Sequence, residues 1–344
     1  MKANVAMTAP AEHAFAPYLK IIGKGPSMSR PFTQSEAREA MRMIIAGTVE
    51  PEQLGAFLLL LRARGETPDE LAGFIEAARE AIDDTALAII PDIDWPSYAD
   101  RHRQQPWFIL AALLLAQNGT RVFMHGIKGE QDGYAPTRPA LKALGIEPCV
   151  DMTCVSTCLQ STGFAYMGLE TFLPTVEVLF DLRPILGLRT LVNTFARAIN
   201  PLQAPCQLQG VVHPPYRDAH QSVAKLLSQP SAIVFKGGGG EVQRNPLKAC
   251  RVAWTRTGGT GEEAGEEAGE EEWPALLSGV SFDWRDEALS PSRIVALWKG
   301  EILEPAVEAA IVGTAALALH AMGKTPTPAE ADQMAQKMWS DREA

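Results

Sequence analysis

Apolar residues recur at helical spacing in three consecutive segments of residues 30–82. Capping-box patterns, in which a threonine is followed three residues later by a glutamate, precede the first and third segments at Thr33 and Thr67. A glycine that can end a helix, Gly65, follows the second segment. We therefore predict three short helices and assign residues 1–88 to an N-terminal helical domain.

From about residue 90 the pattern changes to short apolar runs that alternate with helical segments. The expected strands are residues 121–125, 207–212, 232–235 and 250–255, and the expected helices are residues 108–117, 219–227 and 306–321. Strands that alternate with helices favour a mainly parallel sheet with helices on its faces. We therefore predict an α/β fold in which the small helical domain is followed by a larger α/β domain over residues 89–330.

A low-complexity tract interrupts this pattern at residues 257–272, which end in the letters GEEAGEEAGEEE. A segment with many like charges and few apolar residues cannot bury enough surface to offset the cost of ordering its backbone. We therefore predict an acidic flexible loop inside the α/β domain.

Composition narrows the class of protein. The chain has 344 residues, 46% of them apolar, yet its apolar runs stay well below the roughly 18 residues that span a bilayer. The N-terminus lacks the apolar segment of a secretion signal. The five scattered cysteines are an odd number, which is typical of reduced thiols in a cytoplasm, and the four-residue spacing of Cys154 and Cys158 does not predict a metal site. We expect a cytoplasmic protein with no membrane partner.

Charge is distributed unevenly along the chain. Residues 95–260 contain 16 lysines and arginines against 10 acidic residues, although the whole chain has a net charge of −10. A basic middle region of this kind can bind a polyanion, although ordinary surface variation would also give such a balance.

The stretch Leu182–Pro201, LRPILGLRTLVNTFARAINP, resembles a signature of the anthranilate phosphoribosyltransferases and their nucleoside-phosphorylase relatives, glycosyltransferase family 3. The shared positions are Leu182, Arg183, Leu186, Gly187, Arg189, Thr190, Asn193, Asn200 and Pro201. The likeness ends where these enzymes carry Gly-Pro-Leu, because this chain has Ala196, Arg197 and Ala198 there. The resemblance covers roughly residues 15–325 and implies the same two-domain order as the hydrophobic pattern.

Three catalytic elements that the resemblance implies are altered in this chain. The family's glycine-rich diphosphate loop corresponds to Asp92–Arg103, which contains no glycine. His125 and Gly126 remain from the family's KHGN motif, and Glu241 remains from its metal-binding acidic pair. Bulky residues cannot adopt, without strain, the positive φ that brings backbone N–H groups close to a phosphate, and one carboxylate holds Mg²⁺ poorly. His125, Gly126, Asn193 and Glu241 are therefore predicted to be residual substrate-site positions without a catalytic role.

Cations gather in the segments that would surround the family's cleft. They are Arg101, Arg103, Arg183, Arg189, Arg197, Lys236, Arg244 and Lys248. Trp95, Tyr98 and Trp107 add aromatic faces. Such a combination suits single-stranded nucleic acid, because cations pair with its phosphates and aromatic rings stack on its bases. We predict that Arg197 projects to a phosphate. Gly237–Gly240 forms either an anion-binding turn, which the flanking Lys236 and Arg244 favour, or a flexible hairpin-like turn. The alternative role of each arginine is a structural ion pair.

These motifs together resemble the YbiB-type nucleic-acid-binding branch of the family. The resemblance implies a homodimer formed through the helical domain, joined by a helix near residues 170–188, that binds DNA or RNA without sequence preference, transfers no phosphoribosyl group and needs no cofactor. The acidic tract would then be a solubilising loop or a strap that competes with nucleic acid. The alternative is a divergent glycosyltransferase or phosphoribosyltransferase with an aromatic acceptor, which would use Mg²⁺ and phosphoribosyl diphosphate. A dimeric scaffold for a protein partner is a third possibility.

Overall fold

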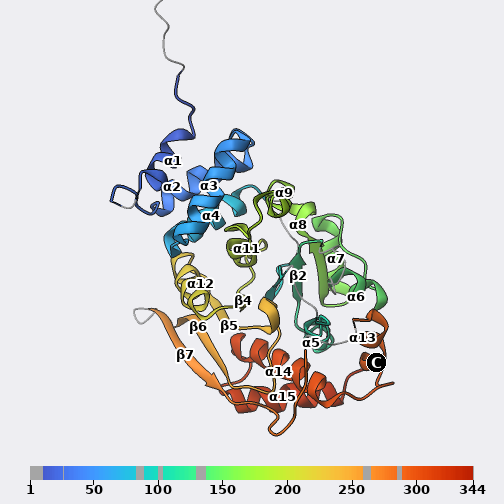
Figure 1. Ribbon diagram of the computed structural model, residues 1–344. Coiled ribbons are helices and arrows are strands. Elements are labelled where there is room, and N and C mark those ends of the chain that lie inside the picture. The colour runs from blue at the N-terminus through green and yellow to red at the C-terminus, as the bar shows by residue number, and fades with distance from the viewer. Residues whose placement is uncertain are drawn as a thin grey trace, which may run out of the picture.

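The computed structural model describes residues 11–25, 27–82, 89–99, 104–128, 137–258, 265–284 and 289–343. Its N-terminal part is a bundle of the helices α1 (Ala16–Gly23), α2 (Gln34–Ile45), α3 (Pro51–Arg64) and α4 (Pro68–Glu80). Thr33 and Thr67 each accept a hydrogen bond from the backbone N–H of the glutamate three residues later, so both predicted capping boxes are confirmed. The bundle forms the upper part of the molecule in Figure 1.

The second part of the chain forms a seven-stranded sheet with the order β3-β2-β1-β4-β5-β6-β7. Its strands are β1 (Ile93–Ser97), β2 (Val122–Gly126), β3 (Phe164–Gly168), β4 (Cys206–Val211), β5 (Ser231–Lys236), β6 (Cys250–Gly258) and β7 (Gly265–Trp273). The first five strands are parallel, and β6 and β7 continue the sheet as antiparallel strands. The predicted mainly parallel sheet is confirmed.

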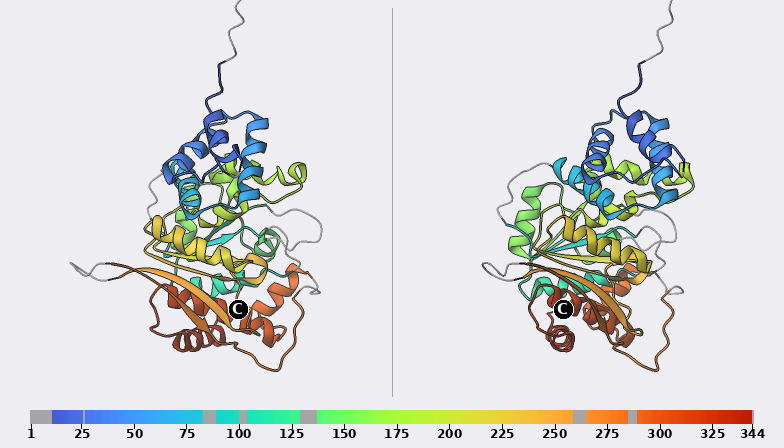
Figure 2. Two further views of the ribbon diagram at one scale, coloured as in Figure 1. Left: turned by 60° about the vertical axis from the view of Figure 1, so that its left-hand side comes forward. Right: turned by 90° about the vertical axis from the view of Figure 1, so that its left-hand side faces the viewer.

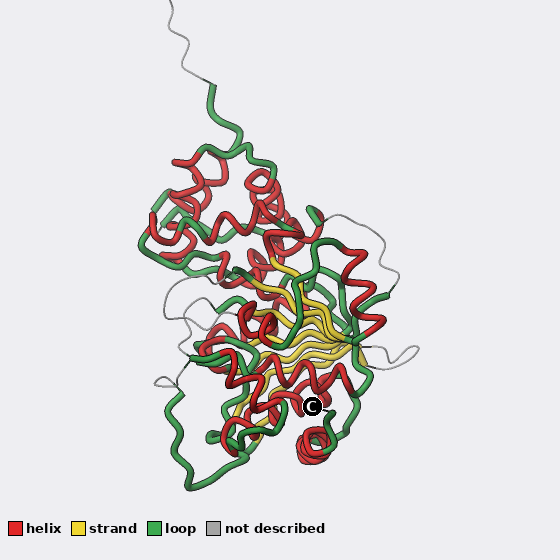
Figure 3. The backbone as a smooth tube through the Cα atoms, turned by 90° about the vertical axis from the view of Figure 1, so that its right-hand side faces the viewer, coloured by secondary structure: helices red, strands yellow, loops and turns green. Residues whose placement is uncertain are grey.

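Helices cover both faces of the sheet, and the strand residues alternate between two hydrophobic cores. Val122 and Met124 pack in the core shared with α5 (Phe108–Gln117) and α14 (Pro305–Ala321), whereas Phe123 packs in the core on the opposite face. The second face is covered by α7 (Met152–Ser161) and α12 (Pro214–Leu226). Figures 2 and 3 show the sheet as a layer between these helices.

A series of short helices links the two parts of the molecule. They are α8 (Leu169–Phe172), α9 (Pro174–Phe180), α10 (Arg183–Leu186), α11 (Val192–Phe195) and the 3-10 turn η1 (Ala196–Ala198). Their buried residues belong to the same hydrophobic core as those of α1–α4. The single joining helix expected near residues 170–188 is therefore a series of three short helices. Pro174 and Pro184 lie in the first turns of α9 and α10 and interrupt the helix, and Gly187 in a left-handed conformation ends α10.

Three expectations need correction. Residues 265–272 of the acidic tract are not a flexible loop but form all except the last residue of the edge strand β7, where Trp254 of β6 packs against Gly269. Residues 93–97, expected as a loop, form the central strand β1. The α/β domain also extends beyond residue 330, because α15 (Pro328–Ser340) packs along α14. In each case, pairing or packing with distant residues stabilises a helix or strand that the local sequence predicts only weakly.

The remaining elements are α6 (Thr137–Ala143), α13 (Pro291–Trp298) and the turn η2 (Gly238–Gly240). Within the described ranges, no helix has the length and apolar content needed to cross a membrane.

Gly126, the last residue of β2, pairs with Ser97, the last residue of β1. A Cβ at this position would lie 2.1 Å from the carbonyl oxygen of Ser97. We therefore predict that Gly126→Ala lowers the free energy of unfolding by about 1–3 kcal/mol, because the two strands must separate. Urea denaturation would measure this loss.

The matched control is Gly55→Ala in α3, where the nearest atom lies 4.0 Å from the added Cβ. This change is expected to keep or raise stability, since alanine has the higher helix propensity. Equal stability of the Gly126 variant and the wild-type chain would contradict the prediction.

Candidate phosphate-binding cleft

Two pockets lie at the carboxyl ends of β4 and β5, the edge at which parallel α/β sheets bind ligands. Both are lined by Val211, the last residue of β4, so they adjoin each other. We call the pocket beside β5 and β6 the outer pocket, the pocket between the helical and α/β domains the interdomain pocket, and the two together the basic cleft.

The outer pocket has a volume of about 490 Å³ and combines cations with aromatic rings. Its cations are Arg217, Lys236, Lys248 and Arg251, and its other lining residues include Gln104, Asn245, Phe282, Asp283 and Trp284. The rings of Phe282 and Trp284 lie 4.5 Å apart and are partly exposed. This pocket can therefore pair phosphates and offer an aromatic face to a planar ring.

A glutamate of the acidic strand β7 holds two of these cations. Glu270 lies 2.8 Å from Nη2 of Arg217 and 3.9 Å from Nη1 of Arg251. Both ion pairs are partly exposed, so salt screens them and each stabilises the fold little. Glu270 thus competes with any anion that enters the outer pocket.

The interdomain pocket is smaller, about 150 Å³, and both domains contribute to it. Arg62 of α3 donates a hydrogen bond to the hydroxyl of Tyr216 in α12 over 3.1 Å, which closes one wall. Arg189, Asn193 and His213 are among its other lining residues. Three of the residues shared with the family signature, Arg189, Thr190 and Asn193, therefore line this pocket.

Arg197 is tied to the backbone between the two pockets. Its side chain is nine-tenths buried, and it donates hydrogen bonds to the carbonyl oxygens of Asn193, Gly210 and Gly240. The prediction that its guanidinium projects outward to a phosphate is therefore wrong, although Arg197 still lines the interdomain pocket. The small residues on either side, Ala196 and Ala198, pack in the core.

A buried polar network crosses the sheet beneath the cleft. Nε2 of His125 lies 3.0 Å from Asp94, and its Nδ1 lies 2.8 Å from the hydroxyl of Tyr98. Asp94 also accepts a hydrogen bond from Gln207 over 3.0 Å. The network continues from Gln207 through Gln209 to His220. His125 is therefore a buried strand residue whose Nδ1 is hydrogen-bonded to Tyr98, while its Nε2 lies close to Asp94 without hydrogen-bond geometry.

The glycine-rich turn after β5 brings backbone segments together. The N–H groups of Gly237, Gly238 and Gly240 donate to carbonyl oxygens of the protein itself, which leaves these three groups occupied. The predicted anion-binding turn is therefore wrong for these groups. A Cβ on Gly237 or Gly210 would lie within about 2 Å of the carbonyl oxygen of Glu241, so these glycines permit close approach.

The donor set at this turn does not fit the Mg²⁺ of the family. Glu241 is buried, and its Oε1 accepts a hydrogen bond from the backbone N–H of Ala99 over 2.8 Å. The neighbouring carbonyl oxygens of Gly210 and Gly240 accept hydrogen bonds from the Arg197 guanidinium. A magnesium ion needs several free oxygen ligands and is repelled by an adjacent cation, so we assign no metal-dependent step to these residues.

The structure separates the predicted cations into different environments. Lys236 and Lys248 are exposed in the outer pocket, and Arg189 lines the interdomain pocket. Arg183 lies at the start of α10, outside both pockets. Arg101 and Arg103 lie outside the described residues.

Arg244 is fully buried and cannot reach a polyanion. It pairs with Asp332 over 2.8 Å and stacks on Trp273. The predicted aromatic surface is also wrong, because the side chains of the residues concerned are at most 1% exposed; these are Trp95, Tyr98 and Trp107.

Several cleft residues escape prediction from the sequence because they lie far from its motifs. They are Arg62, Arg217, Arg251, Phe282 and Trp284. The aromatic pair in Phe282-Asp283-Trp284 is visible in the sequence as a possible stacking surface, but only the fold shows that it lies beside the end of β5.

His220 at the inner end of the polar network leads to a prediction about acid stability. Burial and the nearby charge of Arg197 lower its pKa from 6.5 to about 3. The unfolded chain therefore binds a proton that the folded chain excludes, so stability is retained above about pH 6.5 and lost as the pH falls toward 3. We expect the free energy of unfolding to fall by about 2 kcal/mol more between pH 7 and pH 5 in the wild-type chain than in His220→Gln.

Urea denaturation at both pH values would measure this difference. The control is His213→Gln, which changes an exposed histidine and should keep the wild-type dependence. Parallel pH profiles of the wild-type chain and His220→Gln would contradict the prediction.

Comparison with known proteins matches both parts of the chain to one family. Residues 16–82 match the helical bundle domain of a glycosyl transferase family, and residues 109–267 match the α/β domain of the same family. Anthranilate phosphoribosyltransferase of Beijerinckia indica is 30% identical over 234 residues, which span 66% of this chain and 65% of that relative. The matched part thus spans just under two thirds of that protein.

Solved structures agree with this assignment. Anthranilate phosphoribosyltransferase from Thermus thermophilus superposes with a TM-score of 0.72 at 26% identity, over 90% of this chain and 92% of that chain. The Saccharomyces cerevisiae enzyme in complex with PRPP and Mg has a TM-score of 0.73 at 13% identity, a likeness that shows the fold alone. With both domains matched in the same order, the chain belongs to this glycosyl transferase family and has its anthranilate phosphoribosyltransferase-like fold.

Proposed function

We propose that the protein binds a phosphate-rich ligand in the basic cleft and that this ligand is single-stranded nucleic acid. The observation that carries the proposal is the lining of the outer pocket, in which four cations adjoin the partly exposed rings of Phe282 and Trp284. Lysine and arginine pair with backbone phosphates, and aromatic faces stack on bases without selecting their sequence.

The contacts of the turn after β5, beside the outer pocket, also favour binding over metal-assisted transfer. Glu241 is engaged with the backbone of Ala99, and Arg197 occupies the carbonyl oxygens beside it. The oxygen atoms that a Mg²⁺ ion would need at this turn are thus already hydrogen-bonded, and the guanidinium of Arg197 lies beside them. A polyanion would instead neutralise the cations of the outer pocket directly.

Phosphoribosyl transfer to an aromatic acceptor is the second candidate. The similarity to anthranilate phosphoribosyltransferases favours this transfer reaction. Arg189 and Asn193 of the shared signature also line the interdomain pocket. The same cations and rings would then hold a phosphorylated ribose and a planar acid. Calorimetry with phosphoribosyl diphosphate and Mg²⁺ separates the two: clear binding together with product formation would favour the transferase.

Charge reversal in the outer pocket tests nucleic-acid binding. We predict that Lys236→Glu combined with Lys248→Glu weakens binding of a labelled single-stranded oligonucleotide roughly tenfold or more, and lowers the slope of log K against log salt by about 0.7 for each phosphate that is no longer neutralised. Fluorescence anisotropy across a salt series measures both effects. Lys142→Glu on α6 reverses an exposed lysine outside the cleft and should bind as the wild-type chain does.

Glu270→Gln is expected to change the affinity in the opposite direction. Without this carboxylate, Arg217 and Arg251 lose an anionic partner, so affinity for the oligonucleotide should rise. This change tests whether the acidic strand competes with the ligand. If the double lysine variant binds as tightly as the wild-type chain, the basic cleft is not the nucleic-acid site.

We also propose that the chain forms a homodimer through the helical domain and the short helices beside it. Val178, Ile185 and Leu188 are more than half exposed on and after α9 and α10, which lie next to the bundle in Figure 1. Exposed apolar residues on neighbouring short helices are consistent with a protein interface.

We predict that Ile185→Glu shifts the chain from dimer to monomer, because a charge would be buried in the interface. Light scattering after size-exclusion chromatography measures the mass. Leu303→Glu changes an equally exposed apolar residue elsewhere and should leave the mass unaltered. A wild-type chain that is monomeric at micromolar concentration would contradict the proposal.

A further inference from the structure

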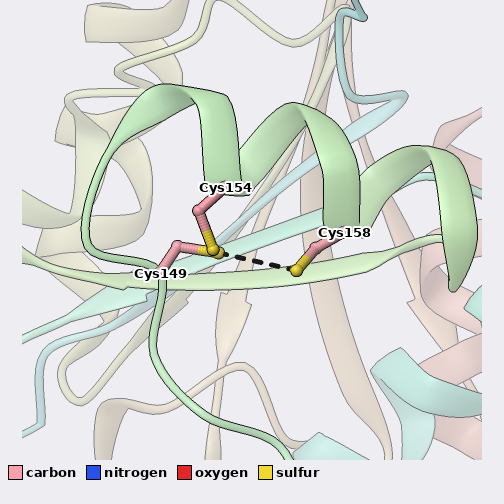
Figure 4. A group of neighbouring side chains, drawn as sticks. All are labelled: Cys149, Cys154 and Cys158. Carbon is pink, nitrogen blue, oxygen red and sulfur yellow. Dashed lines mark hydrogen bonds between the residues drawn. The ribbon is translucent and has the colours of Figure 1, made fainter.

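Three of the five cysteines meet at the edge of the sheet opposite the acidic strand. The Sγ atoms of Cys149, Cys154 and Cys158 all lie within 4.8 Å of one another, and those of Cys149 and Cys158 are 3.8 Å apart. Figure 4 shows the three thiols turned toward a common point between α7 and the segment that precedes it. The cluster adjoins β3, whereas the basic cleft lies at β4 to β6, so the two sites are separate.

The backbone fixes this arrangement without a ligand. Cys149 bridges to Met167 of β3, and its N–H donates to the carbonyl oxygen of Tyr166 over 2.7 Å. Cys154 and Cys158 are four residues apart in α7 and so share one face of the helix. Asp151 caps the same helix by accepting from the N–H of Cys154 over 2.7 Å.

The spacing of the sulfur atoms suits a single thiophilic cation. Sulfurs bound to one Zn²⁺ at about 2.3 Å lie about 3.8 Å apart in a tetrahedron. The pair Cys149 and Cys158 already has this separation, and the third sulfur needs to move by less than about 1 Å to match. The sequence alone did not predict a metal here, because Cys149 joins the other two thiols only when β3 and α7 pack together.

We propose that Cys149, Cys154 and Cys158 form a three-thiolate site for a soft d¹⁰ metal ion such as Zn²⁺. Each thiol releases its proton to solvent as its sulfur–metal bond forms, so three protons leave for each ion bound. The site keeps one coordination position open for water or an external ligand. Cys149 is buried while Cys154 and Cys158 are partly exposed, so an ion enters from the helix side.

Metal titration of the reduced full-length chain tests the site. Competition with a chromophoric zinc chelator should give one ion per chain, and Cd²⁺ should produce an ultraviolet sulfur-to-metal charge-transfer band. Cys154→Ser and Cys158→Ser change partly exposed residues and should each lower the affinity roughly a hundredfold or more, because one of three thiolate bonds is removed.

Cys206→Ala and Cys250→Ala serve as matched controls, since both residues are buried outside the cluster, and they should leave binding unchanged. Thermal unfolding in chelator separates a loss of binding from a loss of folding. No bound ion in the reduced wild-type chain would overturn the proposal, as would equal affinity in the Cys154 and Cys158 variants. Labelling of free thiols after air oxidation shows whether Cys149 and Cys158 instead form a disulfide. A chain that forms this disulfide and binds no metal ion would also overturn the proposal.

Discussion

The guanidinium of Arg197 joins the segments from which the cleft is built. It donates to the carbonyl oxygens of Asn193 beside the helical domain, Gly210 at the end of β4 and Gly240 in the turn after β5. Buried backbone oxygens need hydrogen-bond donors, and a charged donor in a buried site forms strong bonds. These hydrogen bonds therefore tie the segment of α11 and η1 to the end of β4 and to the turn after β5.

The way in which helices cover the sheet decides which polar groups are buried and which remain accessible in the basic cleft. A parallel sheet must be covered on both faces, so α7 and α12 cover one face while α5 and α14 cover the other. The polar groups Asp94, His125 and His220 then lie inside the protein. Gln207 and Gln209 connect Asp94 to His220 by hydrogen bonds, and His125 is hydrogen-bonded to Tyr98. What stays accessible at the carboxyl edge is the basic cleft, with Lys236 and Lys248 on its outer side.

Much of the fold could be predicted because it depends on local periodicity. The capping boxes at Thr33 and Thr67, the apolar helix α5 and the strand β5 all carry their signal within a few residues. The strand β7 carries no such signal, since its glutamates and glycines form a strand only by pairing with β6. The charged side chains along this strand also protect the edge of the sheet from pairing with another chain.

The sequence by itself determined the two-domain order, the mainly parallel sheet and the family to which Leu182–Pro201 belongs. It also placed cations in the middle of the chain, but it could not show which of them face solvent. Arg244 and Arg197 turn inward, whereas Lys236 and Lys248 remain exposed. The tertiary structure alone decided this, because burial depends on which distant segments pack around a side chain. The same reason explains why Cys149 meets Cys154 and Cys158 only in the folded chain.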